Sequence, residues 1–128
     1  MINNARLLSF SLVAFGAVFC LILPLGIVWP SGWSWHAGPP MASHYYMMIV
    51  GVYATLGVFL IRAARDPAAH SSLIWFTVWS SVVHAAIMAV QAAGDPMQQG
   101  HLLGDVPALL LVAAVLGVLM PRGAAKPV

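Results

Sequence analysis

Charged residues are scarce in this sequence. Its 128 residues include five Lys and Arg and three Asp but no Glu, so that 6% of the chain is charged while 62% is hydrophobic. A soluble domain carries about 25% charged residues, so these few cannot provide a water-soluble surface. We therefore expect residues 1–128 to form one domain that lies within a lipid bilayer.

Other absences exclude whole classes of function. The single cysteine, Cys20, rules out an intramolecular disulfide, a CxxC redox pair and a Cys-rich zinc site, and we interpret it as a small residue of the core or the lipid-facing surface. The net charge of +2 comes without a basic cluster, which argues against nucleic-acid binding. No P-loop, G-x-S-x-G or dinucleotide-binding glycine motif is present, so a non-enzymatic protein is favoured.

Long apolar runs take the place of charge. Four segments are each long enough to cross a hydrocarbon core of about 30 Å as a helix; they cover residues 6–29, 43–63, 68–93 and 100–120. Strands are excluded because lipid tolerates no open sheet edge. The predicted fold class is all-α, an integral membrane four-helix bundle with antiparallel, up-down-up-down connections.

The basic residues orient this topology. All of them fall on one side of the four-span arrangement: Arg6, Arg62, Arg65, Arg122 and Lys126. Basic residues near the ends of spans mark the cytoplasmic side, so both termini are predicted to be cytoplasmic. On the other side, Trp29, Trp33 and Trp35 are typical of an interfacial aromatic belt, with a cap over a binding site as the alternative.

Several residues predict where helices begin or bend. Ser43 is expected to cap the second span, and Asp66 to cap the third with Pro67 in its first turn. Pro24 and Pro107 fall within the first and last spans, where each should kink its helix or mark where regular helix begins.

Small residues predict where helices approach one another, because lipid removes the hydrophobic drive between them. They recur at helical spacing on three spans: Gly51, Thr55 and Gly57; Ser81, Ala85, Ala89 and Ala93; Ala113 and Gly117. These faces fit contacts within one chain and contacts between chains equally well.

His84 is the main polar residue inside a predicted span, and such residues are often functional. Met88 and Gln91 follow at four and seven residues, so all three share one helical face. The simplest interpretation is a neutral histidine that hydrogen-bonds across the bundle, with Tyr46 and Tyr53 as natural partners. The alternatives are a metal or haem ligand and a proton relay.

A second polar group lies at the non-cytoplasmic ends of the spans. His44, His101 and Asp105, with nearby methionines, could bind copper or zinc. The alternative is that polar residues at helix ends simply meet water, with Asp105 capping the last helix. His101 and Asp105 are four residues apart and would share a face unless Pro107 delays the helix. A haem on His84 would need a methionine as its second ligand, because these histidines lie at a different depth.

Four segments together carry a resemblance: WPSGWSWH at 29–36, YYMMIVGVYATLGVFL at 45–60, WFTVWSSVVHAAIMAVQA at 75–92 and HLLGDVPALLL at 101–111. They resemble small bacterial four-span inner-membrane proteins of unknown function, and the chain is similar in size and layout to the BphX-like proteins. The resemblance implies a multi-pass protein of the bacterial inner membrane and supplies no activity.

Three functions of different classes remain open. The favoured one is a non-enzymatic membrane protein that acts by association, as a homo-oligomer or as an accessory subunit of a membrane complex, and it predicts that His84 is hydrogen-bonded within the bundle. The second is a binding protein or carrier for a small apolar molecule, a quinone or an aromatic compound, and it predicts a cavity beside His84. The third is a metal- or haem-dependent redox component.

Overall fold

The computed structural model of the chain describes residues 3–29 and 39–122, and every regular element in these ranges is a helix. The all-α prediction is therefore confirmed for the described residues. The elements follow one another as α1 (Asn4–Cys20), α2 (Ile22–Val28), the short 3-10 helix η2 (Pro40–Ala42), α3 (His44–Ala63), α4 (Ser71–Gly94), the 3-10 helix η3 (Pro96–Leu102) and α5 (Asp105–Leu119).

Three of these stretches are long and apolar enough to cross a membrane: α3, α4, and the combined segment Pro96–Leu119. The count becomes four if α1 and α2, which meet at a bend of 52°, form one broken span. Apolar side chains on the outside agree with a lipid environment, since Phe76 and Trp79 on α4 are 62% and 63% exposed. In length and composition these helices are suited to crossing a membrane. The predicted belt residues Trp33 and Trp35 lie outside the described residues.

The break between α1 and α2 has a local cause at Pro24. Proline lacks the backbone N–H that would bond to the carbonyl four residues earlier, and its ring collides with that carbonyl. For Pro24 the carbonyl belongs to Cys20, the last residue of α1, and the chain bends at Leu21. The predicted kink at Pro24 is confirmed.

The starts of α3 and α4 show how far the capping predictions reach. The Ser43 hydroxyl accepts a hydrogen bond from the Tyr46 backbone N–H at 3.2 Å, so the predicted cap of α3 is confirmed. The Asp66 carboxylate accepts from the Ala69 N–H at 3.2 Å, but this bond stabilises a turn and α4 begins only at Ser71. The prediction that Asp66 caps the long helix is therefore wrong, because the turn it caps does not continue into α4.

The start of α5 also differs from the prediction. Gly104, not Asp105, occupies the N-cap position, and the structure shows no side-chain cap there. Asp105 is the first residue of the helix, and its carboxylate bonds to the His101 imidazole instead. Pro107 lies within the first turn, where its missing N–H costs nothing, so it marks where the regular helix begins rather than bending it.

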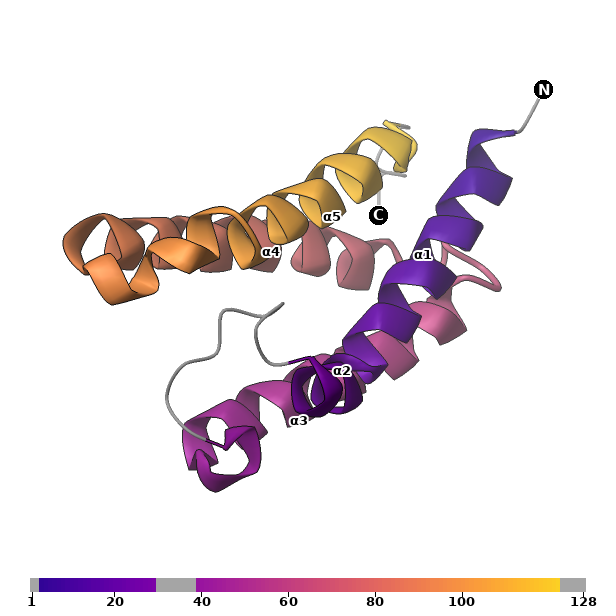
Figure 1. The fold of residues 1–128 in the computed structure, drawn as a ribbon. Coiled ribbons are helices and arrows are strands. Elements are labelled where there is room, and N and C mark those ends of the chain that lie inside the picture. The colour runs from indigo at the N-terminus through magenta and orange to yellow at the C-terminus, as the bar shows by residue number, and fades with distance from the viewer. Residues whose placement is uncertain (1–2, 30–38, 123–128) are drawn as a thin grey trace.

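The helices associate in two pairs, α1 with α3 and α4 with α5, and α1 also packs against α5. Figure 1 shows the pairs meeting near the two termini and spreading apart toward their other ends. At the joined end a core of fully buried side chains fills the space between them: Leu8, Leu12, Leu60, Ile74 and Leu116. The described helices thus form two pairs joined at one end, and this arrangement does not by itself establish the closed four-helix bundle expected from the sequence.

Small residues mark the closest helix contacts, as expected, but only some of those on the predicted faces. Gly57 of α3 is buried against Gly16 of α1, whereas Gly51 has open space around its Cα. On α4, Ser81 and Ala85 are buried, but Ala93 is exposed. The sequence pattern alone did not separate the contact positions from the surface positions.

Candidate functional site

The two helix pairs are linked in their diverging region by a hydrogen bond between Tyr53 of α3 and His84 of α4. The Tyr53 hydroxyl oxygen lies 2.6 Å from Nδ1 of His84. The rings are tilted against one another with centroids 5.8 Å apart, and Phe19 of α1 meets Tyr53 edge-on at 5.0 Å. The expected partnership between these two residues is therefore present, and it joins elements that are far apart in the sequence.

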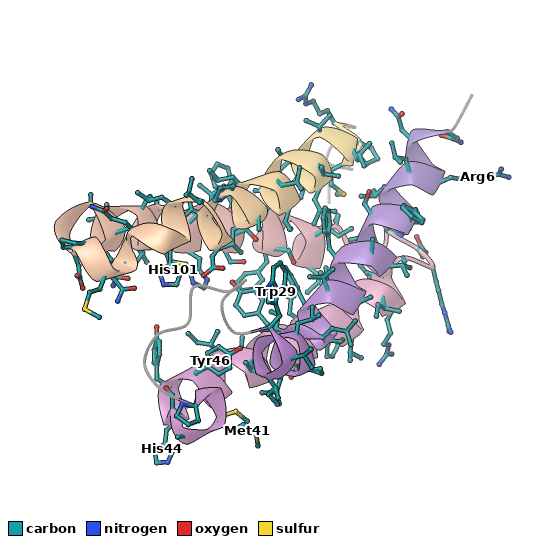
Figure 2. The ribbon with its side chains drawn as sticks, viewed as in Figure 1. Arg6, Trp29, Met41, His44, Tyr46 and His101 are labelled. Carbon is teal, nitrogen blue, oxygen red and sulfur yellow. The ribbon has the colours of Figure 1, made fainter. Side chains whose placement is uncertain are left out.

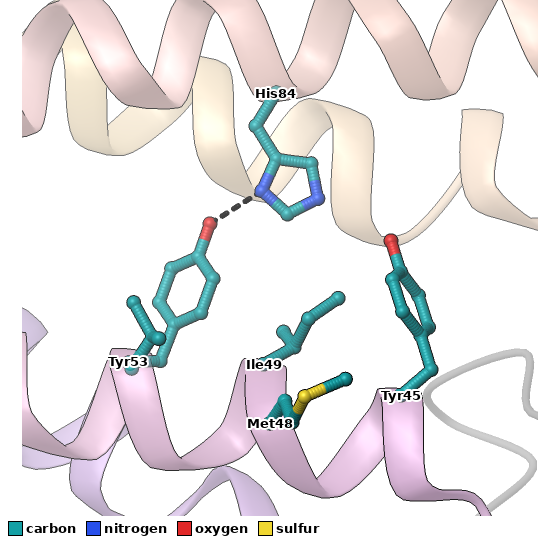
Figure 3. A pocket seen from close by; sticks show the side chains of 6 residues that line it. Tyr45, Met48, Ile49, Tyr53 and His84 are labelled. Carbon is teal, nitrogen blue, oxygen red and sulfur yellow. Dashed lines mark hydrogen bonds between the residues drawn. The ribbon is translucent and has the colours of Figure 1, made fainter.

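An apolar pocket of about 240 Å³ lies beside this hydrogen bond. Its lining comes from one face of α3 and from His84: Tyr45, Met48, Ile49, Val52, Tyr53 and His84. Figure 3 shows His84 reaching down from α4 while the other side chains rise from α3, so that the pocket lies between the two pairs. We call it the His84 pocket. The small-molecule hypothesis predicts a cavity beside His84, and the space found there is an open pocket.

The polar atoms of the pocket sit at one edge. In Figure 3 the second ring nitrogen of His84, Nε2, faces the space between Tyr53 and Tyr45. No described residue makes a hydrogen bond to it. With the ring proton on Nε2, the Tyr53 hydroxyl donates to Nδ1 and Nε2–H becomes a donor toward the pocket. The site therefore combines an apolar floor with a fixed hydrogen-bond donor at its rim.

A second polar pair lies at the junction of η3 and α5. His101 Nδ1 and a carboxylate oxygen of Asp105 are 2.6 Å apart, with side chains that are 16% and 22% exposed. The two residues do not share one helix, since α5 starts only at Asp105, but η3 brings His101 within reach of the carboxylate.

The remaining predicted residues lie around the pocket or apart from it. Met88 packs beside the small buried cluster of Ala85, Val106 and Leu109, on the α4–α5 side. Gln91 is exposed near the end of α4. Tyr46 lies against α2, where its hydroxyl occupies the space that a side chain on Gly26 would need. The structure brings the expected partner Tyr53 to His84, and of the residues expected to share the face of His84 it leaves Gln91 at the surface.

His44 does not join the pair formed by His101 and Asp105. It is exposed at the start of α3, and Figure 2 shows it pointing away from the α4–α5 pair, while His101 points toward the side on which α3 lies. Within the described ranges no three His, Cys, Asp or Glu side chains come together as a metal-binding group. His101 and Asp105 could supply two ligands, an imidazole and a carboxylate.

Most residues of the pocket wall were not singled out as a set by sequence reasoning. Tyr45, Met48, Ile49 and Val52 follow the spacing i, i+3, i+4 and i+7, which places them on one helical face. That signal was available in the sequence. It could not be distinguished from a lipid-facing surface, because both are apolar and only the position of α4 makes this face a pocket.

Comparison with known proteins gives one match. The profile of a family described as a family of unknown function, DUF6632, matches residues 3–127. No curated protein and no solved structure matches the chain. The match agrees with the part of the sequence resemblance that pointed to small proteins of unknown function.

Proposed function

Since the chain belongs to DUF6632, a family of unknown function, we propose its role from its own geometry: it is a non-enzymatic membrane protein that binds a small, mostly apolar molecule in the His84 pocket. The ligand class that fits best is a quinone or another aromatic compound with a carbonyl at its edge. Proteins commonly bind small molecules in apolar pockets that carry a few placed polar groups, and this pocket has that composition.

The observation that carries the proposal is the 2.6 Å hydrogen bond between Tyr53 and His84 at the wall of an apolar pocket. The bond holds the imidazole in one orientation and occupies Nδ1. Nε2 is then the atom available to a ligand, and as a donor it suits a carbonyl oxygen. The aromatic or quinone ring of the ligand would lie over Met48, Ile49 and Val52.

We further propose the setting that the sequence suggests, a bacterial inner membrane with both termini in the cytoplasm and a layout similar to the BphX-like proteins. The support for the orientation is the basic residues. Arg62 and Arg65 lie at the end of α3 and just after it, and Arg122 just after α5, while Figure 2 shows Arg6 near the N-terminus. In this setting the His84 pocket faces the non-cytoplasmic half of the membrane, between helix pairs that diverge there.

The test uses a decyl-substituted benzoquinone and decylbenzene as a matched probe without carbonyls. Protein in mild detergent, with ¹⁵N-labelled histidine, is titrated with each probe while the ring nitrogens are followed by NMR. One hydrogen bond contributes about 1 kcal/mol, so the quinone should bind about five-fold more tightly and should shift the His84 Nε2 resonance.

The variants decide whether the pocket is responsible. His84→Leu should reduce quinone binding to the level of decylbenzene. His70→Leu is the control, because His70 is an exposed histidine just before the start of α4, away from the pocket lining, and its loss should change nothing. Equal binding of both probes, or an unmoved His84 signal at saturation, would contradict the proposal.

Association is the second candidate function, as a homo-oligomer or as a subunit of a membrane complex. The observation that favours it is the exposure of the pocket wall, since Tyr45, Met48 and Val52 are 68%, 63% and 67% exposed. A helix from another chain would cover this face. The mass of the detergent-solubilised protein, measured by light scattering with and without the quinone, separates the two: association predicts an oligomer that forms without any probe.

A further inference from the structure

A second pocket, of about 450 Å³, lies at the joined end of the molecule, away from the His84 pocket. Three separate parts of the chain form it: the start of α1, the connection between α3 and α4, and the end of α5. We call it the terminal pocket. Its lining includes Asn3, Leu8, Asp66, Met120 and Arg122.

The terminal pocket lies where the protein would meet the membrane surface. Asn3 immediately precedes α1, Asp66 follows α3 and precedes α4, and Arg122 follows α5. Three of the helices that end here, α3, α4 and α5, belong to stretches long and apolar enough to cross a membrane, and α1 adds a fourth if it forms one broken span with α2. Their ends therefore lie near the level of the lipid headgroups, where both water and acyl chains are within reach.

The lining of the terminal pocket is divided in the same way as a phospholipid. Leu8 and Met120 are 2% and 4% exposed and supply an apolar base, while Asn3, Asp66 and Arg122 are exposed at the rim. The base suits the first carbons of acyl chains. The rim offers an amide, a carboxylate and a guanidinium to a polar headgroup.

The two charges at the rim have opposite signs and do not pair with one another, since the ion pair found among the described residues is that of His101 with Asp105. One oxygen of Asp66, Oδ1, accepts the Ala69 N–H. Its second oxygen, Oδ2, accepts no hydrogen bond from a described residue. The pocket thus presents a guanidinium and a carboxylate oxygen that can each receive a group of the opposite charge.

We propose that the terminal pocket binds a zwitterionic phospholipid whose headgroup carries a primary amine, phosphatidylethanolamine. The planar Arg122 guanidinium binds the phosphate, since its paired N–H donors can each reach one of two phosphate oxygens. Asp66 accepts an N–H of the ammonium group. Phosphatidylcholine has the same phosphate but a quaternary nitrogen without any N–H, and phosphatidylglycerol has no amine, so neither can donate an ammonium N–H to Asp66.

The experiment is native mass spectrometry of the full chain in mild detergent, with equal amounts of phosphatidylethanolamine, phosphatidylcholine and phosphatidylglycerol of identical acyl chains. For a partly exposed charge pair we expect a preference for phosphatidylethanolamine of about two- to five-fold. Free phosphoethanolamine at the same concentration should not bind, because it cannot use the apolar base formed by Leu8 and Met120.

The variants separate the two charges. Asp66→Asn keeps an oxygen that accepts the Ala69 N–H and removes the charge, so it should abolish the preference over phosphatidylcholine while the protein stays folded. Arg122→Gln should weaken all three lipids. Arg65→Gln is the control, since Arg65 is exposed at the same end but is not part of the pocket lining.

Some outcomes would overturn the proposal. A preference that survives in Asp66→Asn, tighter binding of phosphatidylglycerol, or binding of free phosphoethanolamine as strong as that of the lipid would each exclude it. Helix content by circular dichroism and the melting temperature confirm that each variant is folded. The result is independent of quinone binding at the other end of the molecule.

Discussion

Gly16 and Gly57 meet backbone to backbone where α1 crosses α3. A Cβ on Gly16 would lie 2.6 Å from the Gly57 carbonyl oxygen, and a Cβ on Gly57 would lie 2.5 Å from the Gly16 carbonyl oxygen. The contact is reciprocal, so neither helix can shift alone to make room for a side chain. Close approach of small residues is how membrane helices gain van der Waals contact without help from the hydrophobic effect.

Gly57→Ala is therefore expected to destabilise the protein. An added methyl group in a tightly packed contact costs about 1–3 kcal/mol, here because the new Cβ would meet the Gly16 backbone and the Cys20 side chain. The free energy of unfolding, measured by denaturing-detergent titration with circular dichroism, should fall by that amount. Gly51→Ala is the control: with nothing within 4 Å of its Cβ, the substitution should gain up to about 1 kcal/mol from helix propensity. Equal free energies of unfolding for the two variants would contradict the close contact between Gly16 and Gly57.

Tyr53→Phe should remove the hydrogen bond to His84 while keeping the ring that packs on Phe19. Hydrogen bonds between membrane helices contribute about 0.6 kcal/mol on average and up to about 1.7. A double-mutant cycle of Tyr53→Phe and His84→Leu should therefore give a coupling energy in that range. The effects of the two substitutions on the free energy of unfolding would be strictly additive if Tyr53 and His84 did not interact in the membrane.

Asp105→Ala should loosen η3. Without the carboxylate, His101 loses its contact with the start of α5, and the segment between α4 and α5 opens more often. Amide hydrogen exchange over residues 97–103 should become about two- to five-fold faster, as expected for a pair worth up to about 1 kcal/mol, while the middle of α5 stays protected. Gln99→Ala, on the exposed side of η3, serves as the control. Uniform acceleration across α5 would point to global destabilisation instead.

Pro24→Ala should straighten the break between α1 and α2, because it restores the N–H that the Cys20 carbonyl lacks as a partner. Spin labels at Leu7→Cys and Ile27→Cys, in a Cys20→Ala background, report the distance across the bend of 52°. At 1.5 Å per residue, straightening should lengthen it by about 2–3 Å. Pro107→Ala is the control, because Pro107 lies within the first turn of α5 and its replacement should not alter that helix. An unchanged distance would place the cause of the bend in packing.

The orientation proposed from the arginines has a direct test in whole cells. With Cys20 replaced by Ala, a membrane-impermeant maleimide should label Gln99→Cys in intact cells and Arg65→Cys only after permeabilisation. The two positions lie at opposite ends of α4, so they are expected on opposite sides of the membrane. Labelling of Arg65→Cys in intact cells would reverse the topology.

Much of the fold could be predicted from local signals. The scarcity of charge and the lengths of the apolar runs predict an all-helical chain, because a segment in lipid must satisfy its own backbone hydrogen bonds. The cap at Ser43 and the bend at Pro24 are equally local. Asp66 and Asp105 were misjudged because each has a competing partner, the turn at Ala69 and the ring of His101, and a sequence does not rank such competitors.

The sequence by itself determined the helices, their apolar character and the polar residues within them, since these follow from composition and period. Only the tertiary structure decided which of these residues meet. Tyr53 reaches His84, Gly57 meets Gly16 and not a neighbour of Gly51, and Asp66 shares a pocket with Arg122. The physical reason is that in lipid all faces of a helix are apolar, so the pattern does not mark the inner face. Pairing then depends on shape and on single hydrogen bonds between residues that are distant in the chain.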